Sequence, residues 1–165
     1  MTIVIFIINS FNLTDGLDSL ATTLGIYILT SFGVLFLLSN HFYDATLCFA
    51  GVSSLFAFWF YNKPPAKIFM GDTGSLALGG SLGAVGIITK HEIVLAITGG
   101  LFVLEAVSVM VQVISFKLTG KRIFKMAPIH HHFEKKGLKE PKIIVRFWIV
   151  TLILVLISLA SIKIR

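Results

Sequence analysis

Long apolar stretches alternate with short polar ones along this chain, and the lengths of the apolar stretches predict membrane helices. A helix that crosses about 30 Å of hydrocarbon needs roughly 20 apolar residues. Four stretches reach or approach that length, and a shorter glycine-rich stretch lies between the second and the third of them. We interpret all five as spans, over residues 20–38, 45–61, 75–89, 93–116 and 143–162.

The predicted fold class is therefore an all-α membrane protein. We expect a polytopic helix bundle with five transmembrane helices in a single membrane domain over residues 1–165, plus an amphipathic cytoplasmic segment. Composition agrees, because 56% of the residues are hydrophobic and only 13% are charged, and the mean hydropathy is +0.92. The single cysteine, Cys48, excludes an internal disulfide. Residues 2–8 are apolar but too short to cross, so we expect the chain to be the carboxyl-terminal half of a longer protein.

The distribution of basic residues predicts how the bundle is oriented. Eleven of the 14 Lys and Arg residues lie in or beside the loops 62–74 and 117–142, and three lie at the other face: Lys90, Lys163 and Arg165. Cytoplasmic loops carry an excess of Lys and Arg, so the first face is expected to be cytoplasmic. Segment 9–19 is then cytoplasmic too. Because the basic residues cluster in these loops, we do not expect nucleic acid as a partner.

Three polar clusters end apolar segments at this same face. They cover residues 12–18, 69–75 and 127–133, and they contain three of the eight acids and three of the five histidines. Acidic and imidazole side chains that meet at a water–lipid boundary are typical of an active site. The sequence therefore predicts that the three clusters lie together.

The acids of the first two clusters have two readings each. Asp15 and Asp18 would share a face on a helix, but Asn, Asp and Gly together favour a turn, in which Asp18 caps a helix near Ser19. Asp72 could cap the next helix. It could equally hold Mg²⁺ while the helix amino terminus faces phosphate. Position alone does not separate these alternatives.

The third cluster contains the contiguous run from His130 to His132. Zinc ligands usually have wider spacing, so one metal is not expected to take all three. The run is either a solvated loop or part of a basic amphipathic segment that lies at the membrane surface and attracts a polyanionic substrate. Glu105, inside the fourth span, is a functional candidate or a carboxyl hydrogen-bonded within the bundle. Gly79 and Gly83 favour tight helix packing.

Residues 12–18, 65–80 and 115–148 resemble the second half of the bacterial phospho-N-acetylmuramoyl-pentapeptide transferase family, in the polyprenyl-phosphate hexose-1-phosphate transferase superfamily. The three histidines after Ala127-Pro128-Ile129 are its most specific mark. The resemblance implies transfer of phospho-MurNAc-pentapeptide from UDP-MurNAc-pentapeptide to undecaprenyl phosphate, which gives lipid I and UMP in peptidoglycan synthesis. It also implies Mg²⁺, a multi-pass protein of the bacterial cytoplasmic (inner) membrane, a site that faces the cytoplasm and a homodimer when full length.

The resemblance assigns roles to residues of all three clusters. The implied metal ligands are Asp72 and Asn12. The implied catalytic residues are Asp72, His130, His131 and His132, with His130 and His131 near the phosphates. The implied substrate-binding residues are Asn12, Asp15, Asp18, Asn62, Phe69, Ser75 and Gln112.

Two departures from the family pattern affect what we expect. Full-length members carry an Asp-Asp pair in their first half, which this chain lacks, and Ser19 stands where the motif usually has glycine. We therefore expect that this chain alone does not make lipid I. The alternatives are a non-catalytic fragment of that enzyme and a membrane transporter. A transporter predicts midplane charges in several spans and an inverted repeat, whereas only Glu105 is central here.

Overall fold

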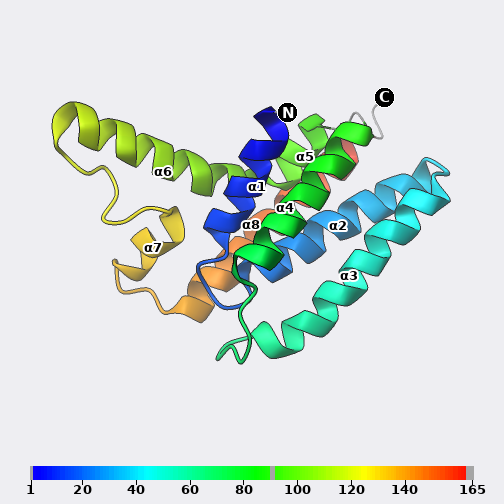
Figure 1. The fold of residues 1–165 in the computed structure, drawn as a ribbon, viewed down its shortest axis with the longest axis horizontal. Helices are drawn as coiled ribbons and strands as arrows, with labels where there is room; N and C mark the ends of the chain where they lie inside the picture. The colour runs from blue at the N-terminus through cyan, green and yellow to red at the C-terminus, as the bar shows by residue number, and fades with distance from the viewer. Residues whose placement is uncertain (1, 90–91, 163–165) are drawn as a thin grey trace.

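The computed structural model describes residues 2–89 and 92–162 as an all-α bundle (Figure 1), as predicted for the fold class. Lys90, Lys163 and Arg165, on which the orientation argument drew, lie outside the described residues. The helices are α1 (Thr2–Thr14), α2 (Leu20–Leu38), α3 (Phe42–Asn62), α4 (Gly71–Ile88), α5 (Glu92–Thr98), α6 (Gly100–Thr119), α7 (Ile129–Glu134) and α8 (Glu140–Ile162). Four of them, α2, α3, α6 and α8, are long and apolar enough to span a membrane.

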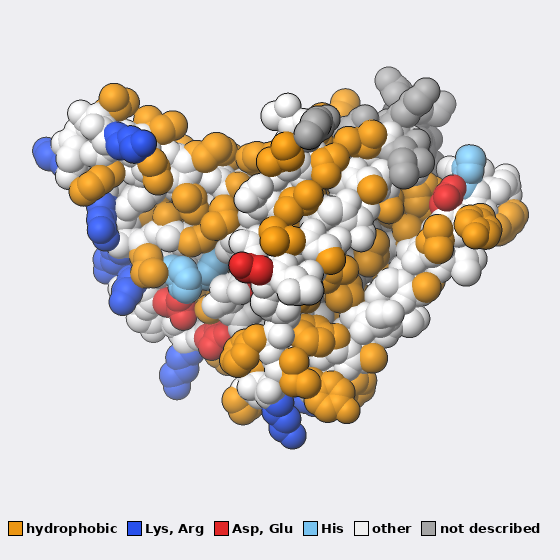
Figure 2. All heavy atoms as spheres, in the orientation of Figure 1, with side chains coloured by type: hydrophobic (Ala, Val, Ile, Leu, Met, Phe, Trp, Pro, Cys, Tyr) orange, Lys and Arg blue, Asp and Glu red, His pale blue; other side chains and the backbone are white. Residues whose placement is uncertain are grey.

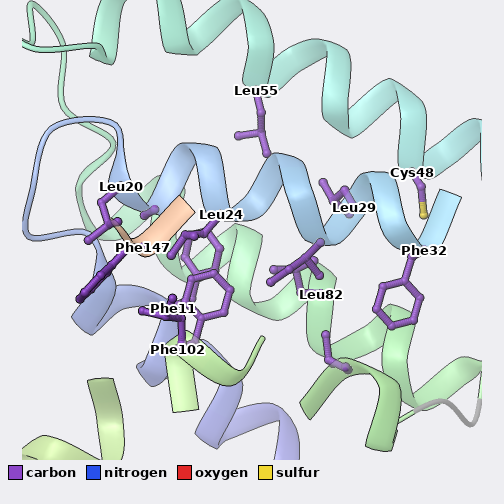
Figure 3. Close-up of a cluster of buried hydrophobic side chains, with 14 of the residues drawn as sticks. Phe11, Leu20, Leu24, Leu29, Phe32, Cys48, Leu55, Leu82, Phe102 and Phe147 are labelled. Atoms are coloured by element: carbon purple, nitrogen blue, oxygen red, sulfur yellow. The ribbon is translucent and has the colours of Figure 1, made fainter. Parts of the chain in front are cut away.

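Helix α2 lies at the centre of the bundle because it is apolar on every side, which is typical of a buried helix. Its most apolar 18-residue window is 72% buried, against 17% to 33% for α3, α6 and α8. Helix α2 packs against α3 as an antiparallel hairpin and also against α8. Figure 3 shows Leu24 of α2 beside Phe11 of α1 and Phe102 of α6, whose ring centroids are 4.8 Å apart.

Helices α1 and α4 pack closely because α4 presents glycine to its neighbour. A methyl group added at Gly79 would lie 2.8 Å from Cα of Ile8, and one at Gly83 would lie 3.3 Å from a methyl carbon of Val4. Small residues allow two helix backbones to approach in this way. The prediction that Gly79 and Gly83 serve helix packing is confirmed, and this contact aligns the ends of α1 and α4 that carry the first two polar clusters.

The prediction of one continuous span over residues 93–116 is wrong. The chain forms α5 and then α6, with a turn at Gly99 between them. Two consecutive glycines, Gly99 and Gly100, weaken the helix at this point because glycine loses the most backbone entropy in a helix. Helix α6 leaves the bundle and projects away from it (Figure 1). Its outward position determines where the histidine cluster lies.

Helix α1 extends further than predicted and includes part of the first polar cluster. The side chains of Asn9, Ser10 and Thr14 donate hydrogen bonds of 2.6–2.8 Å to carbonyl oxygens four residues earlier in the same helix. These bonds satisfy the polar groups locally, so they do not end the helix. As a result Asn12 lies on a rigid helix and not in a loop.

Candidate active site

The first two polar clusters meet where α1 lies beside the start of α4. The Asn12 amide Nδ2 donates to Asp72 Oδ1 at 2.9 Å and to Ser75 Oγ at 2.8 Å. Ser75 is buried and donates in turn to the Gly71 carbonyl at 2.9 Å. Asp72, in the first turn of α4, remains exposed. We call the group formed by Asn12, Asp15, Asp72 and Ser75 the acid pocket.

Asp15 completes the acid pocket from the turn that follows α1. Burial raises the pKa of Asp15 to about 6, a hydrogen bond from the Gly71 backbone opposes this shift, and the nearby charge of Asp72 adds to it. Two carboxylates that repel each other in a partly desolvated place would be stabilised by a cation. The turn reading of residues 15–19 is correct, because these residues lie between α1 and α2 and outside both.

Asp18 joins three segments of the chain at this end of the bundle. Its carboxylate accepts the Ala66 N–H at 2.8 Å, and its own N–H donates to Glu140 Oε1 at 2.8 Å. Helix α2 begins after Ser19 without a side-chain cap, so Asp18 does not cap it. The sequence-based assignment of Asp18 to substrate binding stays a prediction, since its observed contacts are structural.

Asn62 is another predicted substrate contact, and the structure buries its side chain. It is 3% exposed. Its Oδ1 accepts from the Ser19 N–H at 3.0 Å and from the Thr22 hydroxyl at 2.7 Å, and its Nδ2 donates to the Ile68 carbonyl at 3.1 Å. These bonds hold the loop that carries Phe69, whose own side chain is 71% exposed. Of the two, Phe69 is the one that a ligand can reach.

The third cluster contacts the first through His130. This side chain is fully buried, and a methyl group added at Gly16 would overlap its Nε2. The other two histidines face elsewhere: His131 Nδ1 contacts the Glu134 carboxylate, and His132 Nδ1 accepts the Lys125 N–H at 3.0 Å. The prediction that the three clusters lie together is confirmed, whereas the reading of the run as a solvated loop is wrong for His130.

Gln112 holds the basic segment in place. Its Oε1 accepts the N–H groups of Ile123 at 3.1 Å and Phe124 at 2.9 Å, and its Nε2 donates to the Phe124 carbonyl at 3.0 Å. All these bonds are to backbone. The structure thus gives Gln112 a positioning role, and the predicted contact of Gln112 with substrate remains a prediction.

A cationic groove of about 530 Å³ lies between the second half of α6 and the segment that follows it. Its charged lining is Lys117, Arg122, Lys125 and Lys135, and its apolar floor includes Val109, Val113 and Phe116. Figure 2 shows Lys and Arg side chains gathered on this side of the molecule, next to histidine and acidic side chains. A groove with cations above an apolar floor suits an amphiphilic anion.

The described part of the chain, residues 2–89 and 92–162, has no group of three or more His, Cys, Asp or Glu side chains placed to hold one metal ion. The acid pocket offers two carboxylates, a primary amide and a hydroxyl. These are oxygen donors of the kind that Mg²⁺ prefers, and Mg²⁺ usually binds one or two carboxylates and keeps other positions for water or substrate phosphates. The donors therefore fit Mg²⁺ better than zinc.

Fold and site together define a class: a helical membrane protein with a cluster of oxygen donors and a cationic groove, suited to anionic substrates at a membrane surface. The chain belongs to glycosyl transferase family 4, whose profile matches residues 1–90. It is similar to the phospho-N-acetylmuramoyl-pentapeptide-transferase of Pelagibacter ubique (strain HTCC1062), with 58% identity over an alignment that covers 95% of this chain and 48% of that relative. The chain thus spans about half the length of the relative.

Proposed function

We propose that this chain acts in the transfer of phospho-MurNAc-pentapeptide from UDP-MurNAc-pentapeptide to undecaprenyl phosphate. In this reaction the pyrophosphate bond of the nucleotide sugar breaks, a new pyrophosphate bond forms to the lipid phosphate, and lipid I and UMP are the products. One observation carries the proposal: all three polar clusters are in contact, through Asn12 with Asp72 and through Gly16 with His130. The similarity to a transferase of that name supports it.

The acid pocket is the proposed Mg²⁺ site, with Asp72 and Asn12 as ligands. Bound there, Mg²⁺ would neutralise phosphate charge, which is the main requirement of phosphoryl transfer. The Asn12 amide fixes the Asp72 carboxylate through its hydrogen bond, so the ligand is oriented before the ion arrives. Asp15 adds a second negative charge nearby.

The remaining reachable residues have proposed roles in binding. Phe69 offers an exposed ring on which the uracil base can stack. His131, whose side chain is 27% exposed, can donate to a phosphate oxygen. The cationic groove would hold the lipid phosphate, with the prenyl chain along its apolar floor. Both substrates then meet at one face, which we propose to be the cytoplasmic face of the inner membrane.

A transporter is the rival function, and the placement of Glu105 argues against it. This central carboxylate is fully buried and accepts the Ile129 N–H at 2.8 Å. A transport pathway would instead line a water-filled cavity with such groups. The homodimer implied by the resemblance stays a prediction.

The test uses the natural full-length protein in lipid nanodiscs with labelled UDP-MurNAc-pentapeptide, undecaprenyl phosphate and Mg²⁺. We expect UMP and lipid I in equal amounts. Nucleotide-sugar binding with no lipid product would favour a non-catalytic role. Movement of the intact nucleotide sugar across a liposome membrane, with no UMP released, would favour the transporter.

A further inference from the structure

Two polar side chains of α6 hold the segment between α6 and α8 at two points. Glu105 and Gln112 lie seven residues apart, two turns of the same helix, and so on one face. Gln112 binds the backbone of Ile123 and Phe124. Glu105 binds the backbone N–H of Ile129, the first residue of α7. The proposed reaction uses neither side chain directly.

Glu105 also faces a histidine in a place that water does not reach. Its Oε1 lies 3.1 Å from His130 Nδ1, and both side chains are 0% exposed. Burying a carboxylate is costly unless it is paired and hydrogen-bonded. Neither Glu105 Oε1 nor His130 Nδ1 makes a hydrogen bond among the described residues, so proximity and burial hold the His130 ring beside α6.

The far side of the His130 ring lies against Gly16, the residue that follows Asp15 of the acid pocket. Its Nε2 has no hydrogen-bond partner among residues 2–89 and 92–162, and it points at Gly16, where there is no room for a methyl group. Gly16 follows Asp15, which belongs to the pocket. A continuous line of contacts thus runs from α6 through Glu105 and His130 to the turn that carries Asp15.

We infer that Glu105 is a positioning residue of the proposed transferase. Acting through His130, the Glu105 side chain sets the distance between the acid pocket and the histidine and lysine side chains of segment 125–136. This inference rests on the proposed function. It also changes what the resemblance implies for His130: the side chain is part of the support of the site. Of the first two histidines of the run, it leaves His131 as the one within reach of substrate.

The test compares three variants of the natural full-length protein in nanodiscs. Glu105→Ala removes both contacts. Glu105→Gln keeps an oxygen for the Ile129 N–H but replaces the carboxyl group beside His130 with an amide. Gly16→Ala presses on the ring from the other side. Leu104→Ala is the matched control, because Leu104 is the neighbouring residue of α6 and is 54% exposed.

For Glu105→Ala we expect kcat to fall ~100-fold, since a misplacement of about 1 Å can have that effect, with KM for the nucleotide sugar changed less than about threefold. For Glu105→Gln the fall in kcat should be smaller. For Gly16→Ala kcat should fall while KM for the nucleotide sugar stays nearly unchanged. In a His130→Ala background, Glu105→Ala should have little further effect, because residues that act as a unit are not additive. A kcat for Glu105→Ala within about twofold of the Leu104→Ala value, or additive losses in the double variant, would overturn the inference.

A second measurement needs no turnover. In a Cys48→Ala background, spin labels at Lys67 and Lys136, both exposed, report the distance between the loop near the acid pocket and the segment after α7. We expect a narrow distribution in the unsubstituted protein and a broader one with Glu105→Ala. An unchanged distribution would contradict the positioning role. If the unsubstituted protein made no lipid I, that result would count against the proposed function only.

Discussion

The acid pocket and the Glu105–His130 pair both place a carboxylate beside polar partners at the same end of the bundle, and they differ in access. Asp72 is exposed, and its partner Asn12 is half-buried. Glu105 and His130 are 0% exposed, and each faces the other. The pocket is open to a ligand, whereas the pair is closed within the protein.

This difference shows what each carboxylate can do. If the buried Glu105 carboxylate turned towards a ligand, it would leave the Ile129 N–H without its acceptor, at a cost of about 1–3 kcal/mol. It is therefore suited to hold other groups in place. An exposed carboxylate with a free oxygen can exchange water for a cation at little cost. Residue type did not distinguish the two cases, and burial does.

The largest effect is expected from Asp72→Asn. The variant keeps the size of the side chain and can still accept from Asn12, but it loses the charge that we propose to bind Mg²⁺. Turnover should fall roughly 100- to 1000-fold, the usual loss for removal of one group that stabilises transition-state charge. Part of it should return at high Mg²⁺. Near-normal turnover at low Mg²⁺ would remove Asp72 from the metal site.

Asp44→Asn is the matched control for this substitution. Asp44 is likewise an aspartate in the first turn of a helix, α3, and its carboxylate lies 3.7 Å from the His41 imidazole, in an exposed pair. Such pairs contribute little, so turnover and its Mg²⁺ dependence should stay unchanged.

Gly79→Ala should disturb the close packing of α1 against α4, which aligns the residues of the acid pocket. The added methyl group would lie 2.8 Å from Cα of Ile8, and the backbone there cannot move without separating α1 from α4. We expect a loss of about 1–3 kcal/mol in the free energy of unfolding, measured by thermal or denaturant unfolding in detergent. Gly80→Ala is the control, because its methyl group would meet the Ile8 side chain at 3.8 Å. Equal losses in both variants would contradict the close-packing account.

Phe69→Ala should separate binding from stability. The ring is 71% exposed, so its loss should leave the unfolding temperature unchanged. If it stacks on uracil, KM for the nucleotide sugar should rise roughly 5- to 100-fold, from about 1–3 kcal/mol per stacked base. Ile68→Ala, at the neighbouring position and 50% exposed, should leave KM unchanged. A KM for Phe69→Ala equal to that of the control would exclude stacking.

The last effect concerns the pH dependence of the acid pocket. The pKa of Asp15 is raised from 3.8 to about 6, so the folded state holds its proton more tightly than the unfolded state does. Between these two values the free energy of unfolding should fall as pH rises, and above about 6 this contribution should be constant. Without divalent cations, the difference in stability between the unsubstituted protein and Asp15→Asn should follow this curve. A difference that is flat, or that has the opposite sign, would contradict the raised pKa.

Much of the fold could be predicted from hydrophobic lengths alone. Helices α2, α3 and α8 lie within a few residues of their predicted spans, since long apolar stretches determine helix position strongly. The break at Gly99 was missed because hydropathy is high on both sides of it. The sequence did not predict that α1 extends through Asn12. Whether a polar residue stays helical depends on side-chain hydrogen bonds to carbonyl oxygens of the preceding turn, which hydropathy does not report.

The sequence predicted which residues form the candidate site better than it predicted what each residue does there. Three polar clusters at one face could be read from the chain, and they do meet. The structure gives Asn62, Gln112 and His130 supporting positions. These positions depend on burial and on contacts with residues far away in sequence, which the sequence pattern does not contain. The spacing of Glu105 and Gln112 on one face was visible in the sequence, and it was the one signal of their shared task.

The central claim is that the three polar clusters form a single nucleotide-sugar site, and cysteine protection tests it most directly. In a Cys48→Ala background, single cysteines are placed at Thr73 beside the acid pocket, at Lys136 after the histidine run and outside the groove lining, and at Tyr43, which is 81% exposed at the far end of α3. With UDP-MurNAc-pentapeptide and Mg²⁺, we predict slower thiol modification at both Thr73 and Lys136 and no change at Tyr43. Protection at only one of the two positions, or at neither, would contradict a single site.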